Sequence, residues 1–249
     1  MVLGYATDSE MITVRSSHIP IILLFAAALL ATALFGCSKS EPTPVPPTPQ
    51  ATAAEMVELS RTAMAGLDSF SFELTHDSGH TTLSGALDLI RAGGLVATNG
   101  LDLEAEANIG RAFVRVVAVV IGEQTWMTNP LTGVWSEIAP EDSPFSFLDP
   151  VRLVADILGD TQQPIYPASG PSNGEVVISG HIPAQSLAAL VGSVEPDAIP
   201  NVVLTLGFSN NLLKKIVISG VVQPGDEPDY IRVITLSKFN NQTSLKPPI

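Results

Sequence analysis

Apolar residues recur at every second position along several stretches after residue 68, and this period restricts the possible folds more than any other feature of the chain. The clearest stretches read SFSFELTH (69–76), RAFVRVVAVVI (111–121) and NVVLTLGF (201–208). Successive side chains of a β-strand point to opposite faces of its sheet, so a period of two residues predicts a strand with one buried face. The alternation therefore predicts a sheet that buries one of its faces.

Helical patterns are few: one precedes the strand patterns and two are inserted between them. Helices are expected over 51–67, over DPVRLVADILGD (149–160) with its Asp-Pro start, and from near Pro183. The expected strands are 69–76, 83–91, the start of one in GGLVAT (93–98), 111–121, two short ones beside NPLTG (129–133), one in GEVVISG (174–180), 201–208, 212–222 and 229–239. This order lacks the regular alternation of doubly wound folds. We therefore expect an α+β domain with one large, curved antiparallel sheet and helices on its concave face.

The first 50 residues carry a separate pattern that contains the only cysteine of the chain. Met1–Ser17 is polar and includes Arg15, and Ile19–Gly36 is an 18-residue apolar run, a form typical of a signal peptide. Two acidic residues in the first ten leave open whether translation begins at Met1 or at Met11. A permanent transmembrane helix is the alternative interpretation, since such a run could just span an untilted bilayer.

The sequence LFGC (34–37) resembles the bacterial lipobox, in which an aliphatic and a small residue precede a lipidated cysteine. The resemblance implies cleavage after Gly36 and a diacylglyceryl group on Cys37, and a lone buried cysteine is the alternative. Two acyl chains make a durable membrane anchor. We expect a lipoprotein signal peptide (1–36), a lipidated cysteine with a Pro-rich spacer (37–50), and a domain (51–249) on the outward-facing side of a bacterial cell membrane.

Charge and cysteine content exclude two further classes of protein. The chain has 12 Lys and Arg against 25 Asp and Glu, a formal charge of −13, and no basic cluster. This argues against a nucleic-acid binder, because such proteins neutralise phosphates with clustered basic residues. A single cysteine permits no disulfide within the chain, so the core alone must stabilise the domain.

The whole pattern resembles the LppX and LprG group of mycobacterial-type cell-envelope lipoproteins (LppX/LprAFG type), similar in fold to the lipoprotein carrier LolA. The stretches that carry the resemblance are the lipobox and spacer, LDSFSFELTH, VVISGHIPAQSLAALVG, NVVLTLGFSNNLLKKIVISG and ITLSKFNNQTSLKPPI. The resemblance implies a half-open antiparallel barrel whose hydrophobic cavity, beneath the helices, holds the acyl chains of a bound lipid or glycolipid. No obvious charged patch for a head group is present.

Apolar faces of the expected strands supply the candidates for lining such a cavity. They are Phe72, Leu74, Leu87, Leu89, Val114, Val116, Ala118, Leu204, Leu206, Ile216 and Ile218. Two hypotheses remain open. A lipid carrier requires a large apolar cavity between sheet and helices, whereas a membrane-tethered sensor or protein-interaction module of LolA-like fold requires a filled core and an exposed apolar patch. Neither hypothesis identifies a protein partner.

No pattern indicates catalysis or metal binding, so we expect neither an enzyme nor a cofactor or metal. His76, Asp77 and His80 surround a turn, but no third close ligand accompanies the two histidines. The sequence contains no GxSxG, HExxH or P-loop motif. His181 stands near Ser186, but a catalytic triad needs a third partner and an oxyanion donor, and neither is evident.

Overall fold

The alternating stretches form strands of one antiparallel sheet in the computed structural model, which describes residues 51–83, 87–168, 174–241 and 244–249. Twelve strands make up the sheet in the order β7-β6-β5-β4-β3-β1-β12-β11-β10-β9-β8, and β2 pairs with β3 beside this path. The strands are β1 (Phe70–Ser78), β2 (Thr81–Leu83), β3 (Leu87–Ala97), β4 (Gly100–Ile109), β5 (Ala112–Ile121), β6 (Gln124–Thr128), β7 (Trp135–Ile138), β8 (Gln162–Ile165), β9 (Glu175–His181), β10 (Asn201–Gly207), β11 (Leu213–Ser219) and β12 (Ile231–Ser237). Because β7 and β8 do not pair, the sheet stays open.

The sheet consists of two meanders that meet in the middle. One runs from β1 through β3 to β7, and the other runs from β8 to β12. The first and last strands of the domain join them, with Phe72 opposite Leu236 and Leu74 opposite Ile234. The two ends of the domain are thus held together by the ladder at the centre of the sheet.

One α-helix precedes the first strand and two lie in connections between strands. They are α1 (Ala53–Ala65), α2 (Pro150–Asp160) and α3 (Ala188–Val191), with short 3₁₀ helices η1 (Pro140–Asp142) and η2 (Ala184–Leu187). A capping box starts α1, because the Thr52 hydroxyl accepts from the Glu55 amide and the Glu55 carboxylate accepts from the Thr52 amide. Asp149 caps α2 by accepting from the Arg152 amide, with Pro150 at the first position. The cap of α2 is the one that the sequence predicts.

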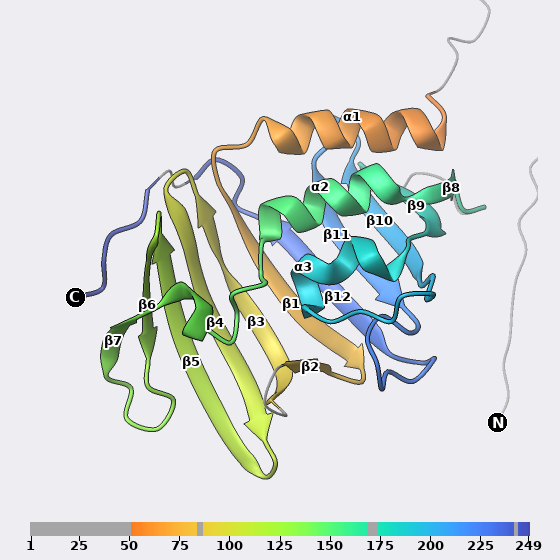
Figure 1. Cartoon of the computed structure of the whole chain (residues 1–249). Helices are drawn as coiled ribbons and strands as arrows, with labels where there is room; N and C mark the ends of the chain where they lie inside the picture. Colours follow the sequence, from red (N-terminus) through yellow and green to blue (C-terminus); the bar gives the residue numbers. More distant parts are fainter. Residues whose placement is uncertain (1–50, 84–86, 169–173, 242–243) are drawn as a thin grey trace, which may run out of the picture. The chain divides into compact units, whose positions relative to one another are not determined.

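The helices lie against one face of the sheet but do not cover all of it. Leu153 of α2 and Leu190 of α3 line the same small cavity as Phe72 of β1 and Leu236 of β12. Over β3 to β6 the facing wall is instead the segment 140–151, which leads from η1 into α2 (Figure 1). The expected fold class, a large antiparallel sheet with helices on one face, is confirmed. The sequence did not predict that the helices cover only part of the sheet face.

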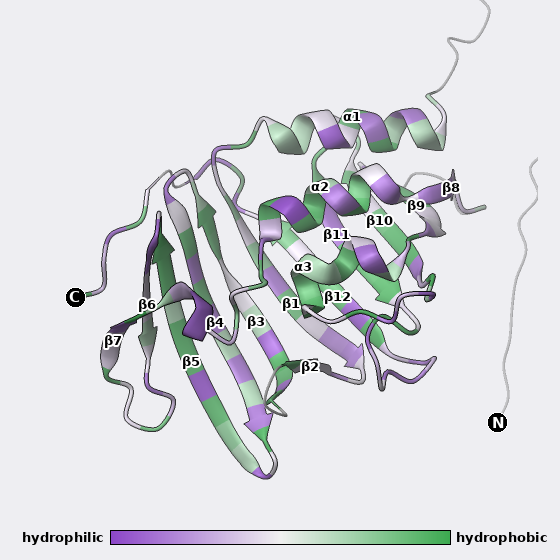
Figure 2. Cartoon of the chain, in the orientation of Figure 1, coloured by the Kyte–Doolittle hydropathy of each residue, from purple (hydrophilic) through white to green (hydrophobic). Residues whose placement is uncertain are grey.

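Several strands differ from the sequence expectation, among them the short strands β2 and β8, which were not expected. β4 was not predicted as a strand, although Leu101, Leu103 and Ala105 alternate with acidic residues along it (Figure 2). The stretches 83–91 and 93–98 were expected to belong to two strands, but β3 runs from Leu87 to Ala97 without a break, with Gly94 opposite Leu103. A Cβ atom on Gly94 would collide with the carbonyl oxygen of Asp102, so glycine here allows a close approach of strands.

Residues Pro49–Ile249 form one compact unit with its own hydrophobic core. No helix among the described residues is long and apolar enough to cross a membrane.

Candidate functional site

The part of the sheet that faces segment 140–151, β3 to β6, borders a cleft of about 670 Å³. Its floor is the aliphatic face of β4 and β5, where Leu103 lies opposite Ala118 and Leu101 lies opposite Val120. Strand alternation places these side chains on the cleft face, while Asp102 and Glu104 point to the other face of the sheet. The cleft volume lies within the roughly 300 to 1,000 Å³ of small-molecule sites.

The opposite wall is the segment that enters α2. Phe145, Leu148 and Pro150 close the cleft on the side of the helices, and Pro140 and Ser143 border it further out. The Asp149 carboxylate also borders the cleft, but it accepts a 2.9 Å hydrogen bond from the Arg152 amide at the start of α2. The cleft therefore combines an aliphatic floor with a mixed facing wall, to which Glu141, Ser143, Ser146 and Asp149 contribute polar groups.

Beneath the helices the molecule is packed. The cavity between α2 and the centre of the sheet measures about 20 Å³ and is lined by apolar side chains such as Leu153 and Val154. Such a volume holds about one water molecule. The space available to a ligand thus lies beside the helices, whereas the family resemblance implies a cavity beneath them.

The eleven residues predicted to line a cavity fall into separate groups. Ala118 lines the cleft, and Phe72, Leu74 and Leu89 line the small cavity under α2. Val114 and Val116 are buried on the same face of β5 as Ala118, and Leu87 is partly buried against the core. The remaining four have no exposed surface and line neither the cleft nor the small cavity: Leu204, Leu206, Ile216 and Ile218.

The cleft also contains residues that the sequence analysis missed. Leu101 and Leu103 went unnoticed because β4 was not predicted, although its alternation was a usable signal. Phe145 and Leu148 belong to a connecting segment without periodicity, so no pattern in the sequence relates them to β4 and β5.

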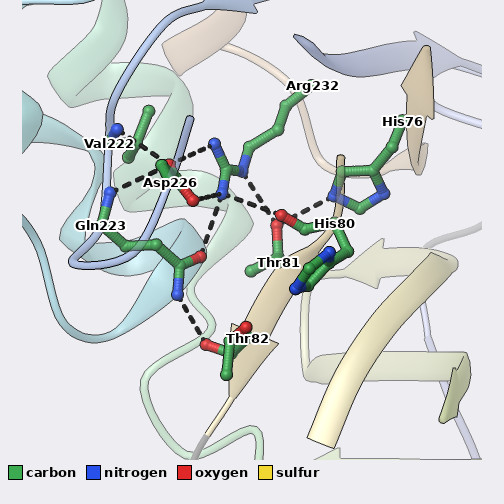
Figure 3. Close-up of polar contacts among 8 residues, drawn as sticks. All are labelled: His76, His80, Thr81, Thr82, Val222, Gln223, Asp226 and Arg232. Atoms are coloured by element: carbon green, nitrogen blue, oxygen red, sulfur yellow. Dashed lines mark hydrogen bonds and ion pairs between the residues drawn. The ribbon is translucent and has the colours of Figure 1, made fainter. Parts of the chain in front are cut away.

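A buried ion pair lies at the far end of the sheet, where the β11–β12 loop meets β2 (Figure 3). The Arg232 guanidinium is completely buried and donates to both carboxylate oxygens of Asp226, each at 2.8 Å. It also donates to the Thr81 hydroxyl at 2.9 Å and to the Gln223 side-chain oxygen at 3.0 Å. Because every charged atom is paired, the network avoids the cost of an isolated buried charge.

His76 extends this network toward β3. Its Nδ1 lies 3.0 Å from the Ile90 carbonyl oxygen and its Nε2 lies 2.9 Å from the Thr81 hydroxyl oxygen. The carbonyl can only accept, so Nδ1 carries the proton of the neutral ring. Burial lowers the pKa of His76, and the nearby positive charge of Arg232 lowers it further, against the opposing effect of the Ile90 hydrogen bond.

The remaining titratable candidates do not assemble into a reactive site. His181 is exposed, and the Ser186 hydroxyl donates to Asp160 at 2.6 Å. Within the described part of the chain, no group of three or more His, Cys, Asp or Glu side chains could hold a metal ion. Cys37, the signal peptide (1–36) and the spacer (37–50) all lie outside the described residues.

Comparison with known proteins identifies the fold. No family model matches the sequence, and no curated protein matches it. The structure of LprF from Mycobacterium bovis aligns with a TM-score of 0.57 and 17% identity, covering 79% of this chain and 96% of LprF. The Mycobacterium tuberculosis lipoprotein LppX aligns with a TM-score of 0.54 and 17% identity, covering 78% of this chain and 98% of LppX.

A LolA superfamily protein from Nitrosomonas europaea aligns with a TM-score of only 0.27, so it adds nothing to the assignment. The predicted resemblance to the LppX/LprAFG type is confirmed at the level of the fold, which this chain shares with LprF and LppX.

Proposed function

We propose that this chain is a bacterial lipoprotein, anchored outside the cell membrane through Cys37, that binds or carries an acylated lipid or glycolipid in the cleft over β3 to β6. The observation that carries the proposal is the 670 Å³ cleft with its aliphatic floor. An acyl chain bound there is removed from contact with water. Each of its buried methylene groups contributes about 0.8 kcal/mol to the free energy of binding. The fold shared with LprF and the lipoprotein LppX, together with the lipobox-like LFGC, supports it. The proposal contains no catalytic step.

A second candidate function is a membrane-tethered sensor or protein-interaction module. The packed region beneath the helices favours it, because the space there is only about 20 Å³. Three apolar side chains exposed at two hairpins, Phe113, Leu131 and Val134, would supply contact surface for a partner of such a module. A module of this kind would keep its cleft empty of lipid.

Two Ala→Trp substitutions at equally buried positions distinguish the lipid-binding protein from the interaction module. Ala118 lines the cleft, and Ala92 lines the small cavity under α2, each with 3% of its surface exposed. In the lipid-binding account, Ala118→Trp fills the cleft, abolishes titration by the fluorescent fatty acid cis-parinaric acid, and changes the free energy of unfolding little. Ala92→Trp overpacks the core, costs about 1 to 3 kcal/mol, and leaves fatty-acid binding intact.

The titration is done on residues 49–249, with thermal unfolding measured on the same samples. Absence of saturable fatty-acid binding by the wild-type protein, together with a large loss of stability in Ala118→Trp, would leave the interaction module as the better account.

A further inference from the structure

Two neighbouring hairpins carry apolar side chains that are exposed to solvent. In the β4–β5 hairpin, Ile109 has 47% of its surface exposed and Phe113 has 60%. In the β6–β7 hairpin, Leu131 is 85% exposed and Val134 is 64% exposed. Both hairpins lie at the end of the sheet remote from α1, because β5 pairs with β4 on one side and with β6 on the other (Figure 1). Exposed apolar side chains gathered at one end of a domain indicate a contact surface.

The β6–β7 turn is held in place by hydrogen bonds of its own. The Asn129 side-chain oxygen accepts from the Leu131 amide at 2.9 Å and from the Thr132 amide at 3.1 Å. The Asn129 amide donates to the Val134 carbonyl at 2.9 Å. Leu131 and Val134 therefore protrude from an ordered turn, so little backbone entropy is lost when they are buried against another surface.

The tips of the two hairpins, residues 109–113 and 129–135, also differ from the rest of the chain in charge. The chain has 25 Asp and Glu against 12 Lys and Arg, but the two tips contain no acidic residue. Their one charged residue is Arg111, which is exposed in the β4–β5 turn. Carboxylates such as Asp88 and Glu106 belong to the strands behind the tips. Such tips suit an anionic lipid surface, because contact attracts an arginine and desolvates no carboxylate.

The length of the chain before the domain allows the tips to reach the membrane that holds the proposed anchor. The chain enters the domain at Ala51, just before α1, and α1 lies remote from the two hairpins (Figure 1). Along the strands the sheet extends for about the length of β5, whose 10 residues span about 33 Å. The spacer 37–50, as an extended Pro-rich chain at about 3.1 Å per residue, spans about 43 Å. Cys37 and the tips can therefore reach the same membrane.

We infer that the tips of the β4–β5 and β6–β7 hairpins dock on the membrane surface, with their apolar side chains in the interfacial layer and Arg111 among anionic head groups. The inference rests on the proposed function, because the anchor at Cys37 brings the domain to the membrane. Protruding side chains enter the fluid interface of a bilayer directly, whereas a protein partner has to provide a pocket for each of them. The hairpins therefore favour a membrane.

Docking through the hairpins would also orient the cleft. Gly100 and Gly122, which border the cleft, lie at the ends of β4 and β5 that are remote from the tips. With the tips on the membrane, this end of the cleft points away from it. The anchor alone leaves the domain free to rotate, so the hairpins add a defined orientation.

A fluorescent reporter on anchored protein tests the docking. Residues 37–249 are coupled through the Cys37 thiol, the only one in the chain, to a maleimide lipid in vesicles of phosphatidylcholine and phosphatidylglycerol. Tryptophan replaces Leu131 in one variant. In the matched control it replaces Phe208, which is 60% exposed in the β10–β11 turn at the other end of the sheet. Brominated lipids should quench the added fluorescence of Leu131→Trp and leave that of Phe208→Trp unchanged.

Further substitutions in the Leu131→Trp protein measure the contribution of single side chains. Phe113→Ser and Phe208→Ser remove two rings of equal exposure. Phe113→Ser should lower the ratio of docked to undocked protein about 10-fold, the value of one large apolar side chain, and Phe208→Ser should not change it. Arg111→Gln should lower this ratio about 5-fold on vesicles that contain phosphatidylglycerol and leave it unchanged on pure phosphatidylcholine.

Equal quenching of the two reporters, or quenching of neither, would overturn docking through the hairpins and leave the proposed function standing, because the chemical coupling replaces the natural anchor. Absence of lipid on Cys37 in bacteria would instead overturn the proposed anchor. Dimers of residues 49–249 in analytical ultracentrifugation, lost in Phe113→Ser but kept in Phe208→Ser, would assign the hairpins to contact between two copies and would also overturn the inference.

Discussion

The Arg232 side chain joins parts of the chain that are far apart in sequence. Its guanidinium holds the β11–β12 loop through Asp226 and the β1–β2 turn through Thr81 and the His80 carbonyl. A buried pair of this kind stabilises little by itself, but removal of one partner leaves a buried charge and is strongly destabilising. After burial, the positive charge of Arg232 is one of the causes that lower the pKa of the neighbouring His76.

His76 should give the stability of the domain a pH dependence. Its pKa in the folded state is lowered, mainly by burial, while the unfolded chain titrates near about 6.5. Between these two values the unfolded state binds more protons, so the free energy of unfolding falls as the pH decreases from about 6.5 and is constant above it.

Urea unfolding of the wild type and of His76→Asn, repeated between neutral and mildly acidic pH, measures this effect. Asparagine can keep the donor to the Ile90 carbonyl but cannot take up a proton. The difference in unfolding free energy between the two proteins should vary with pH only in the acidic part of the range. A difference in unfolding free energy that stays constant across the pH range would show that the pKa of His76 is the same in the folded and unfolded states.

At the level of single elements, local sequence signals predicted most helices and strands. The Asp149 cap and Pro150 identified the start of α2, and alternation identified β1, β5 and β10. The separate strands expected over 83–91 and from GGLVAT (93–98) are wrong, because both stretches belong to β3, in which Gly94 allows close packing of the strands. That contact depends on the partner strand, which no local pattern reveals.

The capping box of α1 gives a quantitative prediction for one element. Thr52→Ala removes the acceptor of the Glu55 amide and should cost about 1 kcal/mol, or about 2 to 4 °C in Tm for a domain of this size. Thr62→Ala on the exposed side of the same helix is the control and should be neutral or slightly stabilising, because alanine is the better helix former. Equal Tm values for the two variants would contradict a contribution of the cap.

At the scale of the whole molecule, the sequence predicted the apolar face of the sheet but not the extent of its cover. Alternation correctly assigned both Ala118 and Leu204 to buried faces. One lines an open cleft and the other belongs to the packed core, because connecting segments decide which part of the face meets a helix. The packing of such connections is set by tertiary contacts, which a period of two residues does not encode.

Substitution of Cys37, the only cysteine of the chain, tests the proposed membrane anchor. In the proposed account, Cys37→Ala abolishes the incorporation of an alkyne-labelled fatty acid into the full-length chain expressed in bacteria, and the precursor keeps its signal peptide. The folded domain should be unaffected, because residues 49–249 have their own core. Equal labelling of wild type and variant would refute lipidation at Cys37.

The central claim, that acyl chains occupy the cleft over β3 to β6, is tested most directly by photo-crosslinking. A fatty acid with a terminal diazirine is bound to the purified domain and irradiated, and the labelled residues are identified by peptide mass spectrometry. The account predicts saturable labelling of cleft residues such as Leu103, Val120 and Phe145, and loss of this labelling in Ala118→Trp. Labelling confined to β9, β10 and β11, or labelling that does not saturate, would contradict it.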